Sequence, residues 1–237
     1  MLAAKVLKLK TYIHEQNSVM GKANKILSKF VDKVFLSYPV EKMKSNYILV
    51  GNPVYITAKT IKKDIYKIKN KILFTSGTLG AKVINNLAIN LINQGYLKDY
   101  DIYIVTGRKY YENVKEKVKD KNVHILPFTN NLIRDIASSD IVISRAGSST
   151  LFEIIGTSTL SIIIPSINVT SNHQYYNALY FKNLGFIEMI EEKELSMNNF
   201  INKLHLLKAD KNIYLQNIKN CDFMNIYDYM IEGVINE

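Results

Sequence analysis

The sequence predicts an α/β protein in which parallel sheets are doubly wound with helices, as in Rossmann-like folds. Short apolar runs alternate with segments of helical periodicity along most of the chain. The apolar runs are continuous and not alternately polar, which is typical of strands buried on both faces of a parallel sheet. With 237 residues and 47% apolar side chains, the chain is long enough for one or two hydrophobic cores.

The expected strands follow from the apolar runs, and the expected helices follow from the segments of helical periodicity. Strands are expected at residues 10–14, 33–38, 46–51, 71–77, 101–107, 123–128, 140–145, 161–166 and 186–190. Helices are expected at residues 23–30, 81–94, 111–119, 131–137, 150–155, 174–184, 197–207 and, in pieces, 213–235. Because right-handed crossovers connect parallel strands, this order predicts a doubly wound sheet.

A domain boundary is expected where Pro53 and a lysine-rich stretch interrupt the alternation. Residues 1–53 hold about three strands and one good helix, too little for an independent Rossmann-like core, so we interpret them as the remnant of a larger domain. Residues 54–210 are expected to form a Rossmann-like domain with a complete sheet. Residues 211–237 are expected to form a C-terminal helix that packs back toward the N-terminal part.

Charge and composition exclude several classes of partner. The net charge is +10, and residues 1–52 hold nine lysines against three acidic residues, which favours contact with an anionic membrane surface. Only three cations are arginines, so we expect no nucleic acid partner. No apolar stretch approaches 18 residues, so any membrane contact is expected to be peripheral. The single cysteine, Cys221, excludes an internal disulfide or a cysteine-based zinc site.

Two glycine-containing turns lead from a predicted strand into a predicted helix. Their glycine and hydroxyl residues are Gly77, Thr78 and Gly80 in the first turn, and Gly147, Ser148, Ser149 and Thr150 in the second. In parallel sheets, ligands bind at the carboxyl ends of the strands. There the backbone N–H groups of glycine turns and helix N-termini can approach a pyrophosphate, and hydroxyls add donors.

Glu153 lies in the second turn of the helix that follows Gly147 and is placed to accept hydrogen bonds from a ribose diol. Together these residues predict a nucleotide site. The alternative is ordinary turn and cap chemistry, since neither turn matches the G-x-G-x-x-G or the P-loop pattern. We expect neither a metal nor a cofactor, with helix dipoles and N–H donors neutralising a leaving diphosphate.

Five polar segments add a longer-range pattern. They are HEQNSVMGKANKI at 14–26, VGNPV at 50–54, SGTLGAKVIN at 76–85, RAGSSTLFEI at 145–154 and NHQYYNA at 172–178. In order and approximate spacing they resemble the MurG family of UDP-N-acetylglucosamine:undecaprenyl-pyrophosphoryl-muramyl-pentapeptide N-acetylglucosaminyltransferases. The resemblance covers essentially the whole chain, and the combination of HEQN with RAG-x-x-T-x-x-E is specific.

The resemblance implies a two-domain GT-B glycosyltransferase fold with a truncated first domain. Residues 1–53 would then belong to the acceptor and membrane side, and residues 54–210 would bind the UDP-sugar. The implied partners are UDP-N-acetylglucosamine as donor and an undecaprenyl-linked muramyl-pentapeptide as acceptor. The implied location is peripheral, at the cytoplasmic face of the bacterial plasma membrane.

The resemblance also implies which residues bind the substrate. These are Asn17, Thr78, Thr129, Gly147, Ser148, Ser149, Thr150, Glu153, His173 and Gln174. Thr129 would offer backbone atoms to uracil, His173 and Gln174 would meet the donor sugar and diphosphate, and Asn17 would lie across the cleft.

Three departures from the family pattern concern the site. Tyr55 stands where the family usually has an arginine, and Leu79 where it usually has a glutamine, so both replacements are expected to weaken donor contacts. The family's N-terminal glycine-rich loop, whose histidine is proposed as the catalytic base, has no counterpart before His14. The base is therefore unassigned, and His14 is a weak candidate for it.

Three functions stay open at this point. The first is an inverting transferase that moves N-acetylglucosamine from its UDP donor to the lipid acceptor. The second is a non-catalytic module that binds nucleotide sugars. The third is one subunit of a split enzyme that acts beside a separate N-terminal chain. Because the family's base segment is missing, we expect the chain by itself to transfer slowly.

Overall fold

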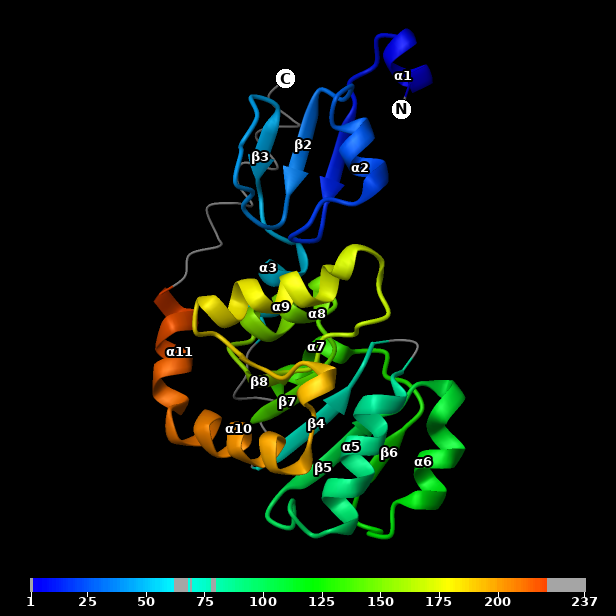
Figure 1. Ribbon diagram of the computed structural model, residues 1–237, viewed down its shortest axis with the longest axis vertical. Helices are drawn as coiled ribbons and strands as arrows, with labels where there is room; N and C mark the ends of the chain where they lie inside the picture. The colour runs from blue at the N-terminus through cyan, green and yellow to red at the C-terminus, as the bar shows by residue number, and fades with distance from the viewer. Residues whose placement is uncertain (1, 62–67, 69, 78–79, 221–237) are drawn as a thin grey trace.

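The computed structural model describes residues 2–61, 68, 70–77 and 80–220, and contains two parallel sheets (Figure 1). The smaller has the order β1-β2-β3, and the larger has the order β6-β5-β4-β7-β8-β9. The strands are β1 Tyr12–Glu15, β2 Lys33–Leu36, β3 Tyr47–Leu49, β4 Lys71–Thr75, β5 Asp101–Val105, β6 His124–Leu126, β7 Ile141–Ser144, β8 Leu160–Ile163 and β9 Glu188–Met189. The predicted parallel α/β fold is confirmed, and each expected apolar run overlaps one of these strands.

Helices connect the strands. They are α1 Leu2–Val6, α2 Lys22–Leu27, α3 Val54–Lys59, α5 Lys82–Asn93, α6 Tyr111–Lys117, α7 Leu132–Ala137, α8 Ser148–Gly156, α9 His173–Asn183, α10 Met197–Ala209 and α11 Lys211–Asn220, with 3-10 turns η1 Arg108–Tyr110, η2 Thr170–Asn172 and η3 Glu192–Glu194. The sequence pattern missed α1 and α3. Helix α3 begins directly after Pro53, a residue that is compatible with the first turn of a helix.

Successive residues along a strand of the larger sheet point alternately into two hydrophobic cores. Ile72 and Phe74 of β4 point into a core that also contains buried residues of α5 and α10. Leu73, between them, points into a second core with buried residues of α8 and α9. Burial on both faces explains why the strands read as continuous apolar runs.

The strand order places a topological switch point between β4 and β7. The chain passes from β4 outward through β5 to β6 and then returns to add β7 on the other side of β4. The connections that leave β4 and β7 therefore start side by side at the carboxyl edge and diverge. Such a point is where open parallel sheets bind ligands.

Tyr38 joins the two sheets. It follows β2 of the smaller sheet, yet only 1% of its surface is exposed, because its ring inserts between α8 and α9. The ring meets Phe152, Tyr180 and Phe181 edge-on, at centroid distances of 5.3, 5.2 and 5.7 Å. Edge-to-face aromatic pairs at these distances are favourable. The smaller sheet is thus attached to the larger one through a shared aromatic core.

A second junction lies between α3 and α8. A Cβ atom on Gly156 would come within 2.6 Å of the Ala58 Cβ and 2.7 Å of the Tyr55 carbonyl oxygen, so only glycine permits this close approach. The proposed domain boundary at residues 53 and 54 falls just before α3. Of the proposed C-terminal segment, α11 contributes Tyr214 and Ile218 to the cores of the larger sheet, and residues 221–237 lie outside the described residues.

Two substitutions of Tyr38 should separate the contribution of its aromatic ring to stability from that of its hydroxyl group. Tyr38→Ala removes a fully buried ring from three aromatic contacts and is expected to lower the free energy of unfolding by about 3–5 kcal/mol. Tyr38→Phe keeps the ring and is expected to cost about 1 kcal/mol or less, since the hydroxyl has only a 3.4 Å contact with Ser148 Oγ. Chemical denaturation measures both, and equal effects of the two variants would contradict the aromatic junction.

Candidate functional site

Two adjoining pockets lie at the switch point and share Gly77. The first has a volume of about 300 Å³ and is lined by Thr75, Gly77, Val105, Phe128, Thr129, Asn130, Asn131, Leu132, Ile133 and Glu153. The second, of about 290 Å³, is lined by Ser76, Gly77, Gly80, Ala81, Arg145, Gly147, Thr150, Ser166 and Gln174. The residues come from the last positions of β4 and β5 and from the connections after β4, β6, β7 and β8, so both pockets lie at the sheet's carboxyl edge.

The first glycine turn is built as the sequence predicts. Gly77 and Gly80 have φ values of +70° and +73°, in the left-handed region that favours glycine. A Cβ on Gly80 would lie 2.1 Å from the Thr106 carbonyl oxygen, so the turn packs directly against the end of β5. Thr78 and Leu79 lie outside the described residues.

Glu153 reaches the first pocket from the second turn of α8. Its atom Oε2 is buried and has no hydrogen-bond partner among the described residues. The apolar neighbours that line the same pocket, Val105 and Leu132 among them, offer the carboxylate no compensation. Burial therefore raises the pKa of Glu153 to about 7. An orphaned carboxyl group aimed into a pocket fits a ligand that supplies hydroxyl donors.

The second glycine turn divides its residues between the pocket and the domain junction. Gly147 and Thr150 line the second pocket, and Ser149 is among the lining residues of neither pocket. Ser148 is 8% exposed, and its hydroxyl donates to the Gln16 carbonyl oxygen at 2.5 Å. The predicted hydroxyl donor of Ser148 is thus occupied within the protein in this structure, and what remains for a ligand is the N-terminus of α8.

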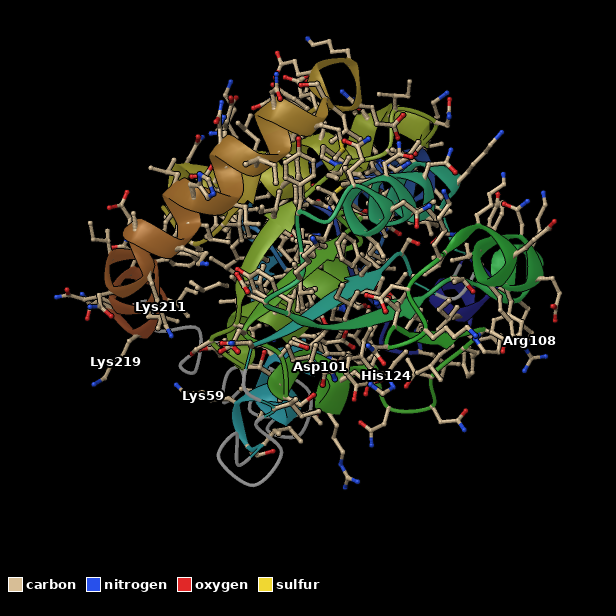
Figure 2. All side chains as sticks on the ribbon, turned by 90° about the horizontal axis from the view of Figure 1, so that it is seen from below. Lys59, Asp101, Arg108, His124, Lys211 and Lys219 are labelled. Carbon is tan, nitrogen blue, oxygen red and sulfur yellow. The ribbon has the colours of Figure 1, made fainter. Side chains whose placement is uncertain are left out.

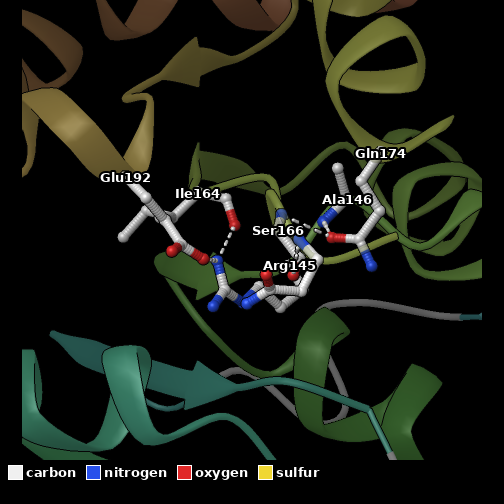
Figure 3. Close-up of polar contacts among 7 residues, drawn as sticks. Arg145, Ala146, Ile164, Ser166, Gln174 and Glu192 are labelled. Atoms are coloured by element: carbon white, nitrogen blue, oxygen red, sulfur yellow. Dashed lines mark hydrogen bonds and ion pairs between the residues drawn. The ribbon is translucent and has the colours of Figure 1, made fainter. Parts of the chain in front are cut away.

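Gln174 and Arg145 line the second pocket, and both form hydrogen bonds to neighbouring backbone groups (Figure 3). Gln174 Oε1 accepts hydrogen bonds from the backbone N–H groups of Ala146, at 3.3 Å, and Ser166, at 2.9 Å, which leaves its amide group to donate. Arg145 Nη1 donates to the Ile164 carbonyl oxygen at 3.0 Å and pairs with Glu192 Oε1 at 2.5 Å. The sequence analysis did not single out Arg145, although it opens the RAG motif.

His173 is the first residue of α9 and follows a left-handed turn. Ser171 and Asn172 have φ values of +54° and +53°, and Asn172 directly precedes the first residue of α9. The His173 atom Nε2 is buried without a hydrogen-bond partner among the described residues. Like the Glu153 carboxyl, it is a polar atom that a ligand could satisfy.

Asn17 is hydrogen-bonded to Asn177 of the larger domain. Asn177 is a residue of α9 to which the sequence analysis assigned no role. Asn177 Nδ2 donates to Asn17 Oδ1 at 3.1 Å, and Asn177 Oδ1 accepts from the N–H and hydroxyl of Ser18, at 2.8 and 3.0 Å. Asn177 Nδ2 also lies 3.4 Å from the Ala146 carbonyl oxygen. The amide therefore ties the HEQN loop to the turn that lines the second pocket.

Glu15 shapes the HEQN loop from within. It is 4% exposed and accepts hydrogen bonds from the backbone N–H groups of Asn17 and Gly21, both at 2.9 Å, and from Asn24 Nδ2 at 2.8 Å. Burial opposes ionisation, but these hydrogen bonds together outweigh it and lower the pKa of Glu15. The carboxylate is therefore a structural anchor that presents Asn17.

His14 is engaged in the smaller sheet. Its Nε2 lies 2.9 Å from Ser37 Oγ and 3.2 Å from the Gly51 carbonyl oxygen, while Ser37 Oγ itself donates to that carbonyl at 3.0 Å. A carbonyl can only accept, so this arrangement makes Nε2 a donor. Burial lowers the pKa of His14. These bonds fit a side chain that ties β1 to the ends of its neighbours better than they fit a catalytic base.

Thr129 lines the first pocket with its side chain turned to the protein. Its hydroxyl donates to Asp135 Oδ2 at 2.5 Å, and Asn131 Oδ1 caps α7 by accepting from the Arg134 N–H at 3.3 Å. The loop that follows β6 is thereby fixed.

No metal or membrane-spanning feature was found in the part of the chain that the structure describes. Within the described ranges, no group of three or more His, Cys, Asp or Glu side chains is arranged to hold a metal ion. No helix in those ranges is both long and apolar enough to cross a bilayer.

Comparison with known proteins identifies the fold. The family model for the glycosyltransferase family 28 C-terminal domain matches residues 71–229, and the model for the family 28 N-terminal domain matches residues 1–36. Among solved structures, the chain resembles Acinetobacter baumannii MurG, with a TM-score of 0.79 and 21% identity over 100% of this chain and 70% of that one. It also resembles the kitacinnamycin glycosyltransferase, with a TM-score of 0.66 and 12% identity over 91% of this chain and 58% of that one.

Curated relatives are more similar in sequence. UDP-N-acetylglucosamine--N-acetylmuramyl-(pentapeptide) pyrophosphoryl-undecaprenol N-acetylglucosamine transferase 1 of Bacillus cereus is 36% identical over 92% of this chain. The corresponding transferase of Acetivibrio thermocellus is 33% identical over 93% of it. The chain spans 63% and 64% of the lengths of these two relatives. The matched domain models, the shared GT-B fold and the switch-point pockets agree, and the chain therefore belongs to glycosyltransferase family 28, where it is similar to the MurG enzymes.

Proposed function

We propose that this chain binds UDP-N-acetylglucosamine and serves the transfer of N-acetylglucosamine to undecaprenyl-pyrophosphoryl-N-acetylmuramyl-pentapeptide, the lipid I to lipid II step of peptidoglycan synthesis. The observation that carries the proposal is the pair of adjoining pockets, one with an orphaned carboxyl group and the other at a helix N-terminus. The names of the similar transferases support the choice of donor and acceptor.

Each of the two pockets binds a different part of the donor. In the first, Glu153 accepts the ribose hydroxyls and the loop at Thr129 contacts the base. In the second, the N–H groups at Gly147 and the start of α8 receive the diphosphate, with the helix dipole favouring its charge. The amide of Gln174, at the same rim, donates to the sugar or its phosphate.

The proposed reaction is an inverting displacement at the anomeric carbon. The acceptor hydroxyl attacks that carbon, the bond to the diphosphate breaks, and UDP leaves with the electron pair. The N–H groups at the start of α8 stabilise the charge that develops on the diphosphate. Asn17, held by Asn177 next to the second pocket, faces the reacting sugar. The base that takes the acceptor proton remains unassigned among the described residues.

We also propose peripheral contact with the anionic cytoplasmic face of the plasma membrane. Helices α1 and α2 lie at the end of the molecule away from the larger sheet (Figure 1). This region exposes the apolar side chains of Val6, Leu7, Leu9 and Ile26, and it belongs to the segment that holds nine lysines. Lysines around exposed apolar side chains suit an anionic lipid surface.

Substitution of Glu153 tests the donor site. Glu153→Gln keeps the side-chain size but removes the charged acceptor, so we expect UDP to bind roughly tenfold more weakly in isothermal titration calorimetry. Glu112→Gln, an exposed glutamate on α6, is the matched control and should leave the affinity unchanged. Absence of binding of UDP to the unaltered protein at millimolar concentration would falsify the nucleotide site.

The raised pKa of Glu153 predicts how stability depends on pH. Because the folded-state pKa of about 7 exceeds the ordinary glutamate pKa of 4.5, the protonated carboxyl favours folding. Its contribution to the free energy of unfolding is fully present below pH 4.5 and is lost as the pH rises through 7, by roughly 3 kcal/mol at most. Denaturation of the unaltered protein and of Glu153→Gln between pH 4.5 and 8 measures the difference, and parallel profiles would argue against a buried acid.

Vesicle sedimentation tests the membrane surface. The double substitution Leu7→Ser and Leu9→Ser should reduce binding to vesicles that contain phosphatidylglycerol several-fold, because it removes exposed apolar area. Ile213→Ser, which alters an exposed apolar residue of α11, is the control and should bind as before. Equal binding to neutral and anionic vesicles, or no effect of the double substitution, would contradict the proposal.

A further inference from the structure

Strand β6 forms one edge of the larger sheet and is open on its outer side. Within the described residues it pairs with β5 alone. The Leu126 carbonyl oxygen accepts from the Thr106 N–H at 2.9 Å, so the backbone groups of Leu126 face β5. Because backbone groups alternate in direction along a strand, the N–H and C=O of Ile125 point to the free edge. Such an edge can pair with a further strand.

A groove lies beside this edge, between β6 and α6. It has a volume of about 390 Å³ and is lined by Tyr111, Lys115, Val118, Lys119, Asp120, Lys121, Val123 and Ile125. Val118, Val123 and Ile125 are its aliphatic residues, and they pack against the hydrophobic core on this face of the sheet. On the other face of β6, Leu126 is 37% exposed. The strand therefore offers apolar surface on both faces beside its open edge.

The groove carries an excess of positive charge. Three of its residues are lysines without an ion pair in the part of the chain that the structure describes, namely Lys115, Lys119 and Lys121. The ammonium group of Lys115 lies 5.6 Å from the centre of the Tyr111 ring. Asp120, which also lines the groove, accepts from the Asn122 N–H at 2.9 Å within its own turn. Positive charge without an internal partner favours an acidic ligand.

The position of the groove argues against a lipid surface and against a second copy of the chain. Helix α6 lies toward the end of the molecule away from α1 and α2, the helices proposed to meet the membrane (Figure 1). Seen from below, Arg108, which begins the turn before α6, lies on the opposite side from Lys211 and Lys219 of α11 (Figure 2). Pairing of two β6 edges would bring the groove lysines of both copies together, and like charges repel.

We propose that the open edge of β6 and its groove bind an extended acidic segment of a partner protein, which adds a strand to the larger sheet. The segment accepts a hydrogen bond from the Ile125 N–H and donates one to the Ile125 carbonyl oxygen. Pro127, at the next outward position, has no N–H group and ends the pairing. This surface shares no residue with the two donor pockets, so the inference goes beyond the proposed function.

The alternation of side chains defines the chemistry of the segment. Successive side chains of an added strand point to opposite faces of the sheet. Acidic side chains on the α6 side meet the groove lysines, and their methylene groups cross the apolar floor at Val118 and Val123. Apolar side chains on the opposite side cover Leu126. The segment is therefore one in which acidic and apolar residues alternate.

Fluorescence anisotropy with labelled peptides and the full chain tests the proposal. The probe is a short peptide of alternating glutamate and valine, and its control has lysine in place of glutamate. The double variant Lys115→Glu and Lys121→Glu should bind the acidic peptide roughly tenfold more weakly, because it reverses the charge of the groove. Lys211→Glu with Lys219→Glu is the matched control, since it changes the net charge equally on α11 and should bind as the unaltered protein does.

Hydrogen exchange separates strand addition from attraction between charges. The bound acidic peptide should slow exchange of the Ile125 amide, because that amide becomes hydrogen-bonded. The same peptide with methylated backbone amides cannot donate to the Ile125 carbonyl oxygen and should bind roughly tenfold more weakly. Thermal unfolding of both double variants should match that of the unaltered protein, which excludes loss of the fold as the cause.

Each contrary outcome overturns a stated part of the proposal. If the methylated peptide binds as well as its parent, or the Ile125 amide stays unprotected, charge alone attracts the peptide and strand addition is wrong. If the acidic and basic peptides bind equally, or neither binds, the acidic partner is wrong. Protection of Ile125 that rises with protein concentration in the absence of peptide would identify a second copy as the occupant.

Discussion

The site depends on one constraint of the larger sheet, the reversal of strand order that puts β7 beside β4. The connections that leave these two parallel strands run in opposite directions, and a gap therefore opens at the carboxyl edge of the sheet. The glycine turn after β4 and the start of α8 after β7 form the two sides of that gap, and both pockets contain Gly77. A nucleotide diphosphate would therefore contact two turns that lie about 70 residues apart in the chain.

The smaller sheet is coupled to this gap by buried contacts. Tyr38 shares the aromatic core beneath α8 and α9, while Asn177 and Ser148 bind the HEQN loop through its Asn17 side chain and Gln16 carbonyl oxygen. Both α8 and α9 also supply the pocket residues. Movement of the smaller sheet would thus disturb the helix N-terminus proposed to hold the diphosphate, and this links the position of the smaller sheet to the proposed nucleotide site.

The polar atoms left unsatisfied mark the chemistry more clearly than the motifs do. Glu153 Oε2, in the first pocket, and His173 Nε2, at the start of α9, are buried without partners among the described residues. By contrast, the His14 ring and the Ser148 hydroxyl, both candidates in the motifs, are satisfied within the protein. Because a buried polar group without a partner is costly, the unsatisfied Glu153 atom in the first pocket is the one that best fits a ligand with hydroxyl donors.

The sequence by itself determined the parallel α/β fold, the strand positions and the placement of Glu153 one turn into a helix after Gly147, because these depend on local periodicity and turn chemistry. Only the tertiary structure decided which side chains face the ligand. Ser148 and Ser149 are neighbours in one motif, yet the Ser148 hydroxyl is bound by Gln16, more than 130 residues away. Lys115 and Ile125 belong to no motif and line one groove because α6 packs beside β6. Such long-range contacts are set by packing, which local sequence patterns do not encode.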